Sequence, residues 1–346
     1  MLEIDGSFGE GGGQILRTTL SLAALTGCEV GVTNIRAARD KPGLRPQHLT
    51  AVLAVADICS AEVAGAEVGA TSLVFRPRKV RGGTYEFDVS KVRASAGSTT
   101  LVLQTVLWPL AFSGKTSRVI LRGGTHVPHA PAFNYIDEVF LPTIAHMGLV
   151  CHCRMTKAGY YPIGGGELLL EIRPVGDLMP LDLSKRAEPL TAELTSAVSN
   201  LPDSIAERQL NTGVERLRAL GLHWESRLTR YPSPGRGTVF FAALRADKVR
   251  AGFQSLGELH KPAEKVAADA CNEMEAYLQT GMALDKHLAD QLIVPMALAR
   301  GFSRLTTCQV TRHLLTNVAV VEKLLDVHFH VTGAIGEPGC VERVEA

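Results

Sequence analysis

Hydrophobic residues in the first part of the chain alternate between helical and strand-like spacing. Apolar residues recur at helical spacing over 15–25, and Gly27 follows as a typical helix end. A strand-like segment, a polar loop and a second helical pattern come next, at 28–35, 36–46 and 49–56. Strand-like sequence then continues to Phe75. The predicted order is therefore helix, strand, loop, helix and strands.

This order recurs twice along the chain. The second copy has a helix, a strand, a loop and a helix, at 101–110, 117–121, 123–131 and in the residues before Gly148. The third has a helix, a strand, a junction and a helix, at 288–300, 305–310, 311–313 and 314–325. Such repetition indicates one supersecondary unit used several times. If the copies pack around one centre, their strand-to-helix junctions line a common cleft, where ligands generally bind in α/β folds.

The pattern changes between residues 181 and 255, where proline, serine and charged residues become frequent. A separate helix at 204–220 is followed there by strand-like segments at 224–228 and 238–243. We therefore predict an α/β protein of the α+β type. Three repeats in 1–180 and 256–346 form one domain around a central cleft, and 181–255 form a smaller inserted α/β domain.

Composition narrows the functional classes. The net charge is +1, from 36 Lys+Arg against 35 Asp+Glu, which argues against a broadly basic surface that binds a polyanion along its length. Any nucleic acid would be bound locally by a few arginines. The seven cysteines form no CxxC pair and are typical of reduced core residues in a cytoplasmic protein. Cys151, His152 and Cys153 could suggest a metal site, but their side chains alternate in direction within a strand-like segment. We therefore interpret them as structural. Neither a signal peptide nor a membrane span is expected.

His313 lies in the first turn of the predicted helix 314–325, where Thr311 can cap the free amides. The positive end of the helix dipole there disfavours imidazolium and keeps the ring neutral and nucleophilic. A histidine that only packs at a helix start is the alternative interpretation. Arg312 is adjacent and could assist the ring.

Residues 9–13 combine four glycines with Glu10 immediately before a helix, and Arg17 follows one turn later. This arrangement lets a phosphate approach free backbone amides, and a carboxylate beside it suits a divalent ion that bridges to nucleotide oxygens. A simple tight turn is the alternative, because the segment lacks a P-loop lysine and dinucleotide spacing.

The loop 36–46 concentrates donors suited to phosphate oxygens or ribose hydroxyls. They are Arg36, Arg39, Lys41 and Arg45, followed by Gln47 and His48 at the next helix start. A solvated basic loop is the alternative, although two prolines stiffen this segment.

Polar residues on two other helices are further candidates. Asp290 and Gln291 could serve a metal or a base edge, or could cap the helix that follows. Gln104 lies in an otherwise apolar helix, so its amide needs a partner, and a ligand is one option.

Together these segments identify a resemblance to the RNA 3′-terminal phosphate cyclases that extends nearly end to end. The matching motifs are Asp5-Gly6, 10–17, 41–44, 47–52, 75–77, 81–83, 101–107, 123–125, Tyr161-Pro162 with 164–166, 288–292 and 313–317. The segment 181–255 resembles the family least.

The resemblance implies three βαβαββ repeats, similar to the C-terminal domain of a bacterial translation initiation factor, and a smaller insert. It also implies that His313 attacks the α-phosphorus of ATP to form a covalent histidine-AMP and pyrophosphate. AMP would then pass to the 3′-terminal phosphate of an RNA, and the neighbouring 2′-hydroxyl would expel it and close a 2′,3′-cyclic phosphate.

The resemblance assigns roles residue by residue. Glu10 would hold Mg²⁺ or Mn²⁺ against the ATP phosphates. Phosphates of ATP or of the RNA end would contact Arg36, Arg39, Gln47 and His48. ATP would contact Gln14, Arg17, Gln104, Pro131, His287, Leu288, Ala289, Asp290 and Gln291. Pro131 would cover one face of adenine, and His287 stands on the other face, where members commonly have tyrosine.

Two other protein classes remain as rivals. Non-catalytic relatives that assist ribosome assembly share the fold but lack the nucleophilic histidine, which this chain has. Enolpyruvyl transferases share similar repeats without this motif set.

Overall fold

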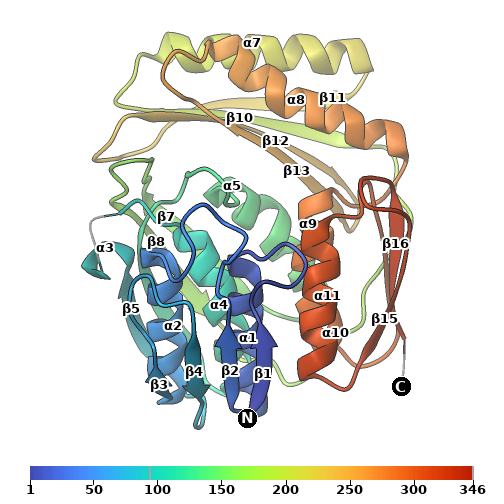
Figure 1. Cartoon of the computed structure of the whole chain (residues 1–346). Coiled ribbons are helices and arrows are strands. Elements are labelled where there is room, and N and C mark those ends of the chain that lie inside the picture. The colour runs from blue at the N-terminus through green and yellow to red at the C-terminus, as the bar shows by residue number, and fades with distance from the viewer. Residues whose placement is uncertain (93–94, 345–346) are drawn as a thin grey trace.

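The computed structural model describes residues 1–92 and 95–344 (Figure 1). Its first repeat contains β1 (Leu2–Asp5), α1 (Gly13–Thr26), β2 (Val30–Thr33), α2 (Pro46–Cys59), β3 (Glu62–Ala64) and β4 (Leu73–Arg76). The strands form a sheet in the order β1-β2-β4-β3, in which β1 is parallel to β2 and the other neighbours are antiparallel.

The second repeat has the same topology. Its elements are β5 (Thr84–Asp88), α3 (Val89–Val92), α4 (Thr99–Ala111), β6 (Ser117–Gly123), α5 (Phe133–Tyr135), the π-helical η1 (Ile136–Phe140), α6 (Leu141–Ala145), β7 (Cys151–Lys157) and β8 (Gly166–Ile172). The sheet order β5-β6-β8-β7, with β5 parallel to β6, repeats the pattern of the first sheet.

The third repeat is interrupted after its first strand. Its elements are β9 (Asp182–Leu183), α9 (Lys286–Gln291), α10 (Ile293–Leu298), β14 (Ser303–Thr307), α11 (Arg312–Leu324), β15 (His328–Thr332) and β16 (Gly339–Val344). The strand β9 pairs in parallel with β14 and completes the sheet β15-β16-β14-β9. Three βαβαββ units are therefore present, which confirms the predicted fold class.

The helix predicted over 288–300 is in fact two helices. They meet at Leu292, and α10 ends at Leu298. Pro295 accounts for the break, because a proline has no N–H to donate and its ring collides with the carbonyl four residues earlier.

The inserted unit contains β10 (Thr191–Ser199), α7 (Asp203–Leu220), β11 (His223–Arg230), β12 (Gly237–Ala246), β13 (Val249–Leu256) and α8 (Ala263–Thr280). Its sheet has the order β11-β10-β12-β13, and a second hydrophobic core gathers residues between Leu190 and Tyr277. Since β9 belongs to the third repeat and α8 packs in this second core, we propose boundaries near 190 and 280 in place of 181–255.

The helices of the three repeats face one another in the centre, and the sheets lie outside them (Figure 1). The helix α1 packs against α2, α4 and α11 there, so one apolar core serves all three repeats. The inserted sheet lies above this body with α7 and α8 on its outer face (Figure 1). Within residues 1–92 and 95–344, no helix is both long and apolar enough to cross a membrane.

Candidate active site

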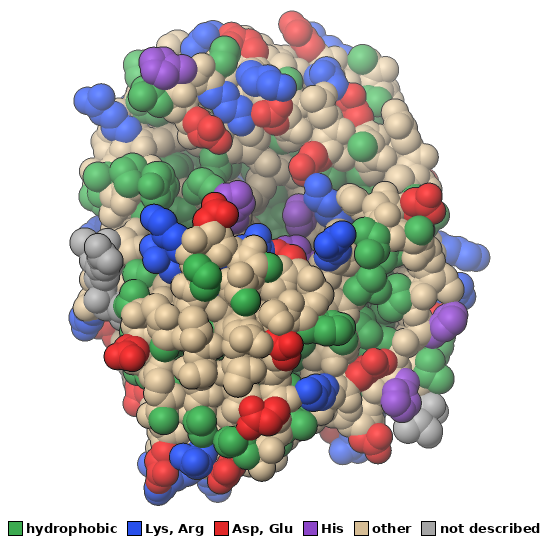
Figure 2. Space-filling model, viewed as in Figure 1, with side chains coloured by type: hydrophobic (Ala, Val, Ile, Leu, Met, Phe, Trp, Pro, Cys, Tyr) green, Lys and Arg blue, Asp and Glu red, His purple; other side chains and the backbone are tan. Residues whose placement is uncertain are grey.

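A cavity of about 970 Å³ opens between the central helices and the inserted unit, and Figure 2 shows it as a hollow with histidine and basic side chains around it. All three strand-to-helix junctions reach its wall, as their equivalent positions in the repeats predict. Most of the predicted site residues line it: Glu10, Gln14, Arg17, Arg36, Arg39, Gln47, His48, Gln104, Pro131, His287, Asp290, Gln291 and His313.

Two of the predicted ATP contacts lie elsewhere. Leu288 and Ala289 are fully buried in the main core and are not part of the cavity wall. They belong to the same helix as His287 and Asp290, but to its inner face. Their side chains pack α9 onto the core and so support the residues that do face the cavity.

His313 occupies the first turn of α11. The hydroxyl of Thr311 accepts a hydrogen bond from the Leu314 amide at 3.0 Å, which confirms the predicted cap. The His313 side chain is about half exposed, at 48%, and lines the cavity. Arg312 is exposed and is not among the lining residues. The helix start therefore presents the imidazole to the cavity and leaves its neighbour outside.

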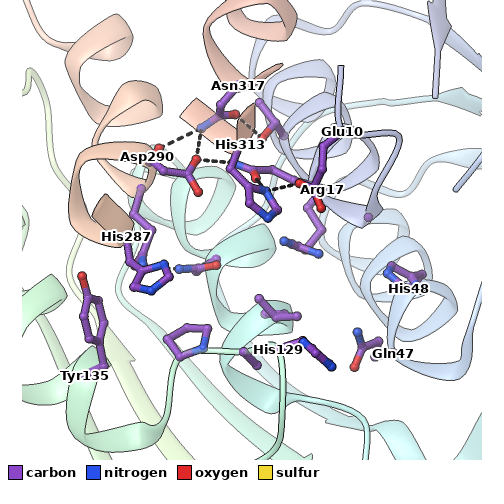
Figure 3. Close-up of a pocket in the computed structure, with 18 of the residues that line it drawn as sticks. Glu10, Arg17, Gln47, His48, His129, Tyr135, His287, Asp290, His313 and Asn317 are labelled. Atoms are coloured by element: carbon purple, nitrogen blue, oxygen red, sulfur yellow. Dashed lines mark hydrogen bonds and ion pairs between the residues drawn. The ribbon is translucent and has the colours of Figure 1, made fainter. Parts of the chain in front are cut away.

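Gln14 connects His313 to a buried carboxylate. Its Oε1 atom lies 2.6 Å from Nδ1 of His313, and its amide nitrogen donates to Asp290 (Figure 3). Asn317 donates to the backbone carbonyl of Asp290 at 2.9 Å and accepts from the hydroxyl of Thr18 at 2.7 Å. Residues from α1, α9 and α11 thus hold the ring in one orientation.

The partners of His313 decide which ring nitrogen is free. Nδ1 faces Gln14 Oε1 and the carboxylate of Glu10, and both of these are acceptors. The proton therefore resides on Nδ1 and Nε2 keeps its lone pair. Burial lowers the pKa of the imidazole; Asp290 opposes this change, whereas Arg17 and Arg39 add to it. The neutral form expected from the helix dipole is favoured, with burial as the main cause.

Glu10 is held by groups on both sides. Its carboxylate forms an ion pair with Arg39 and contacts Nδ1 of the neutral His313, and its backbone amide donates to the Thr316 hydroxyl at 3.2 Å. The neighbouring glycines allow other side chains to pack closely against this segment of the backbone. A Cβ on Gly9 would come within 2.2 Å of that hydroxyl, and one on Gly13 within 2.2 Å of His48 Nε2. The glycine segment therefore serves close packing at the cavity wall as well as a turn.

Positively charged side chains gather around Glu10 at the cavity wall. Burial lowers the pKa of Arg17 to about 10, so it stays protonated at neutral pH. Burial, together with four nearby arginines, holds the pKa of His48 well below its usual value. Since Nδ1 of His48 accepts from the Arg45 amide at 3.3 Å, its Nε2 carries the proton and can donate. An anion in the cavity can therefore bind both to charged arginines and to the neutral N–H donor of His48.

The basic loop is folded rather than merely solvated. Arg36 donates to the carbonyls of Lys41 and Gly43, at 2.7 and 3.0 Å, and so closes the loop on itself. Gln47 accepts from the Ser98 amide at 2.9 Å and ties the first repeat to the second. Lys41 and Arg45 also line the cavity.

The opposite end of the cavity is aromatic and amide-lined. Gln104 donates to Gln291 at 2.8 Å, so the partner of this helix amide is another side chain. Asp285 caps α9 through the amides of His287 and Leu288, at 2.8 and 3.0 Å. The helix α10 that follows has Leu292 at its N-cap without a side-chain hydrogen bond, so Asp290 and Gln291 do not cap it, and both face the cavity from the last turn of α9.

Several residues of the site were not predicted. Tyr135 donates to Asp285 at 2.8 Å and stands edge-on to His287, with ring centres 6.4 Å apart. Gln254 of β13 binds the loop 130–132 through two hydrogen bonds, and Asn317 lies one turn beyond His313. Helical spacing from His313 could have indicated Asn317, whereas the other two depend on contacts between distant segments. Figure 3 shows Tyr135 and His287 on one side and Gln47 and His48 on the other.

A family model described as RNA 3′-terminal phosphate cyclase matches residues 8–331. The chain belongs to the RNA 3′-terminal phosphate cyclase family. Proteins named RNA 3′-terminal phosphate cyclase are similar to it over almost their whole length. The one from Methylococcus capsulatus is 45% identical, covering 93% of this chain and 91% of its own. That from Trichormus variabilis is 43% identical, with 93% and 94% covered.

A third relative has a similar identity and coverage. The cyclase of Pyrobaculum neutrophilum is 40% identical, with 96% of this chain and 95% of its own covered. Among solved structures, the enolpyruvyl transferase NikO from Streptomyces tendae aligns with 98% of this chain and 65% of its own, at 12% identity and a TM-score of 0.25, which is too low a similarity to support an inference. The cyclase family match spans every predicted site residue from Glu10 to His313.

Proposed function

We propose that this protein converts the 3′-terminal phosphate of an RNA to a 2′,3′-cyclic phosphate at the expense of ATP, through a covalent histidine-AMP. The observation that carries the proposal is the orientation of His313. Its Nδ1 proton is engaged by Gln14 and Glu10, so Nε2 is the free nucleophilic atom at the wall of a basic cavity.

In the first step, the lone pair of His313 Nε2 attacks the α-phosphorus of ATP. A nitrogen–phosphorus bond forms, the bond to the bridging oxygen breaks, and pyrophosphate leaves with that electron pair. The ring then carries positive charge, which the carboxylate of Glu10 at Nδ1 stabilises. Burial is the main reason that the ring is neutral beforehand, and Arg17 and Arg39 add to this effect.

Two transfers complete the reaction. An oxygen of the RNA 3′-phosphate attacks the phosphorus of the histidine-AMP, which frees His313 and joins AMP to the RNA end. The neighbouring 2′-hydroxyl then attacks the 3′-phosphorus, loses its proton and expels AMP. Each step is nucleotidyl or phosphoryl transfer, in which positioning and charge stabilisation are the main contributions of the protein.

The two ends of the cavity suit the two halves of ATP. The arginines and His48 supply donors for phosphate oxygens, and Arg17 remains charged at neutral pH. At the other end, His287 and Pro131 both line the cavity and can cover the faces of adenine. Gln104 and Gln291 offer amide groups to its edge.

Glu10 fits a role toward a divalent cation. Magnesium in nucleotide sites takes one or two protein carboxylates and completes its shell with phosphate oxygens and water. The carboxylate of Glu10 lines the cavity beside Arg39, which is expected to bind phosphate, and among the described residues no group of three metal-binding side chains forms a separate site. Mg²⁺ or Mn²⁺ held by Glu10 would neutralise the phosphate oxygens of ATP.

The state of the cysteines supports this proposal, and the alternative of a non-catalytic protein fits the site less well. All seven cysteines are among the described residues and none is paired, which supports a reducing, cytoplasmic location. A non-catalytic assembly factor of this fold has no use for a nucleophilic histidine oriented toward a basic cavity. We therefore favour the enzyme over the binding protein.

The test is to incubate the protein with ATP labelled at the α-phosphate and a divalent cation. We expect label to remain on the denatured protein as an acid-labile phosphoramidate, and to be released from it as AMP by 3′-phosphorylated but not 3′-hydroxyl RNA. His313→Asn should not be labelled. Equal labelling of His313→Asn and wild type would show that another residue is the nucleophile.

A further inference from the structure

An exposed aromatic residue stands near the phosphate end of the cavity. Tyr161 is 69% exposed, and Ile163, two residues later, is 59% exposed. Both belong to the tight turn between β7 and β8, which the Gly164 amide closes by donating to the Tyr160 carbonyl at 2.7 Å. The sequence motif Tyr161-Pro162 with three following glycines has no task in the chemistry proposed above.

The base of this turn is firmly held. Tyr160 is 4% exposed and its ring stacks on His126 at 5.2 Å, and His126 in turn stacks on Tyr231 of the inserted unit at 5.6 Å. Gly164 and Gly165 have φ angles of 68° and 69°, which glycine adopts without strain. The exposed ring of Tyr161 is therefore carried by an ordered turn and does not lie in a loose loop.

The turn is next to the phosphate-binding end. A Cβ on Gly164 would lie 3.0 Å from the Cα of Ala96, and two residues later the Ser98 amide donates to Gln47. Ala96 also packs in a small cluster with Leu101 and Ala130, both of which line the cavity. A single layer of residues thus separates the turn from the cavity wall.

The inserted unit adds a second loop to the same place. A Cβ on Gly235 would lie 3.2 Å from Ile163, and one on Gly165 would lie 2.7 Å from Pro234. Arg236, in this loop, is exposed. Figure 2 shows hydrophobic side chains gathered at the left end of the hollow with basic side chains beside them, and the β7–β8 turn is at that end in Figure 1.

We propose that Tyr161 is a stacking platform for a base of the RNA substrate as the strand leaves the cavity. The inference rests on the proposed function, which brings a 3′-terminal phosphate to the arginines and Gln47. A strand bound there has to leave by the open end, and single-stranded nucleic acid is generally held by a basic groove combined with exposed aromatic rings. Aromatic stacking accepts any base, so Tyr161 would contribute affinity without sequence preference.

The experiment measures binding of a 3′-phosphorylated oligoribonucleotide to the full-length protein in the absence of ATP. We expect Tyr161→Ala to weaken binding on the order of tenfold, the effect of losing one stacked base. Tyr161→Phe, which keeps the ring, should bind like the wild type. Phe302→Ala is the matched control, because Phe302 is 53% exposed but precedes β14 in the third repeat. Labelling of His313 by ATP should be unchanged in all three variants.

Two further measurements distinguish the loss of a stacking contact from a general weakening of RNA binding. The salt dependence of RNA binding should keep its slope in Tyr161→Ala, because tyrosine releases no counterion. Replacing RNA bases one at a time by abasic positions should weaken binding to the wild type at one position, and this loss should vanish in Tyr161→Ala.

Equal RNA affinity of wild type and Tyr161→Ala would overturn the platform, as would additive effects of Tyr161→Ala and every abasic position. Because binding is measured without ATP, this outcome is distinct from failure of the proposed function, which would appear as unlabelled His313. If Tyr161 instead contacts a protein partner, wild type and Tyr161→Ala should bind RNA with equal affinity.

Discussion

The side chain of Gln14 joins His313 to Asp290: its oxygen lies 2.6 Å from the imidazole Nδ1, and its nitrogen donates to the carboxylate. Three segments that are far apart in the sequence therefore share one hydrogen-bonded relay. The relay orients the proposed nucleophile, because a ring that loses its Nδ1 acceptor can rotate Nε2 away from the cavity.

Replacing Gln14 by alanine should slow the formation of histidine-AMP about tenfold, the effect of one lost hydrogen bond to the ring. The rate is measured as labelled protein in a single-turnover quench at saturating ATP. Gln104→Ala is the control, since Gln104 lies at the other end of the cavity and should change ATP affinity rather than this rate. A rate in Gln14→Ala equal to that of the wild type would remove the relay from the mechanism.

Arg39→Ala should both slow histidine-AMP formation and shift its pH dependence. Arg39 helps to lower the pKa of His313, so in wild type the reactive neutral ring persists to more acidic pH. Without Arg39 the pKa of His313 rises, and the acid limb of the rate profile moves to higher pH. The profile is recorded for wild type, Arg39→Ala and the exposed Arg312→Ala, which should follow the wild type. A shift to lower pH, or none, would contradict the assignment.

His287→Tyr should strengthen ATP binding about threefold to tenfold, because a larger ring offers more stacking area to adenine. His287→Ala should weaken ATP binding by a similar factor. The concentration of ATP that gives half-maximal labelling of His313 measures both effects. If the two variants change this concentration in the same direction, the ring of His287 does not cover adenine.

Glu10→Gln should raise the concentration of Mg²⁺ or Mn²⁺ needed for half-maximal labelling about tenfold, because an amide oxygen replaces a charged ligand. Removal of the cation by a chelator should abolish labelling of the wild type. Asp40→Asn is a suitable control, since Asp40 is another carboxylate at the cavity wall. The role of Glu10 would be refuted by a metal titration that coincides with that of the wild type.

The stability of the fold should fall as the pH drops below about 6.5, in part through His126. Burial lowers the pKa of His126 to about 4. The unfolded chain therefore binds this proton first, and the contribution to stability is present above pH 6.5 and is lost toward pH 4, with a limit of about 3 kcal/mol. Urea unfolding at a series of pH values should show a shallower decline in His126→Gln. Parallel declines for both proteins would show that His126 is not the responsible group.

Local patterns in the sequence were sufficient for much of the fold. Helical spacing and Thr311 located α11 and its cap, and the recurrence of helix, strand and loop located the three repeats. These features depend on neighbouring residues along the chain, where spacing and capping act directly. The Pro295 break was missed because the apolar spacing continues across it, although the proline itself was a signal.

The limits of the inserted unit were decided by packing. The helix α8 has an apolar face, but the sequence does not state which sheet that face covers, and only the second core assigns α8 to the insert. The split of α9 into an inner face with Leu288 and a cavity face with His287 likewise follows from its position on the core.

By itself the sequence determined the kinds of chemical group in the site: a histidine at a helix start, a carboxylate among glycines and a basic loop. Only the tertiary structure decided which of them meet. It brought Gln14 between His313 and Asp290 and thereby set the free nitrogen of the ring. It also placed Tyr135 and Asp285 behind His287. Hydrogen bonds and charge effects act over a few ångströms in space, and separation along the chain does not predict such distances.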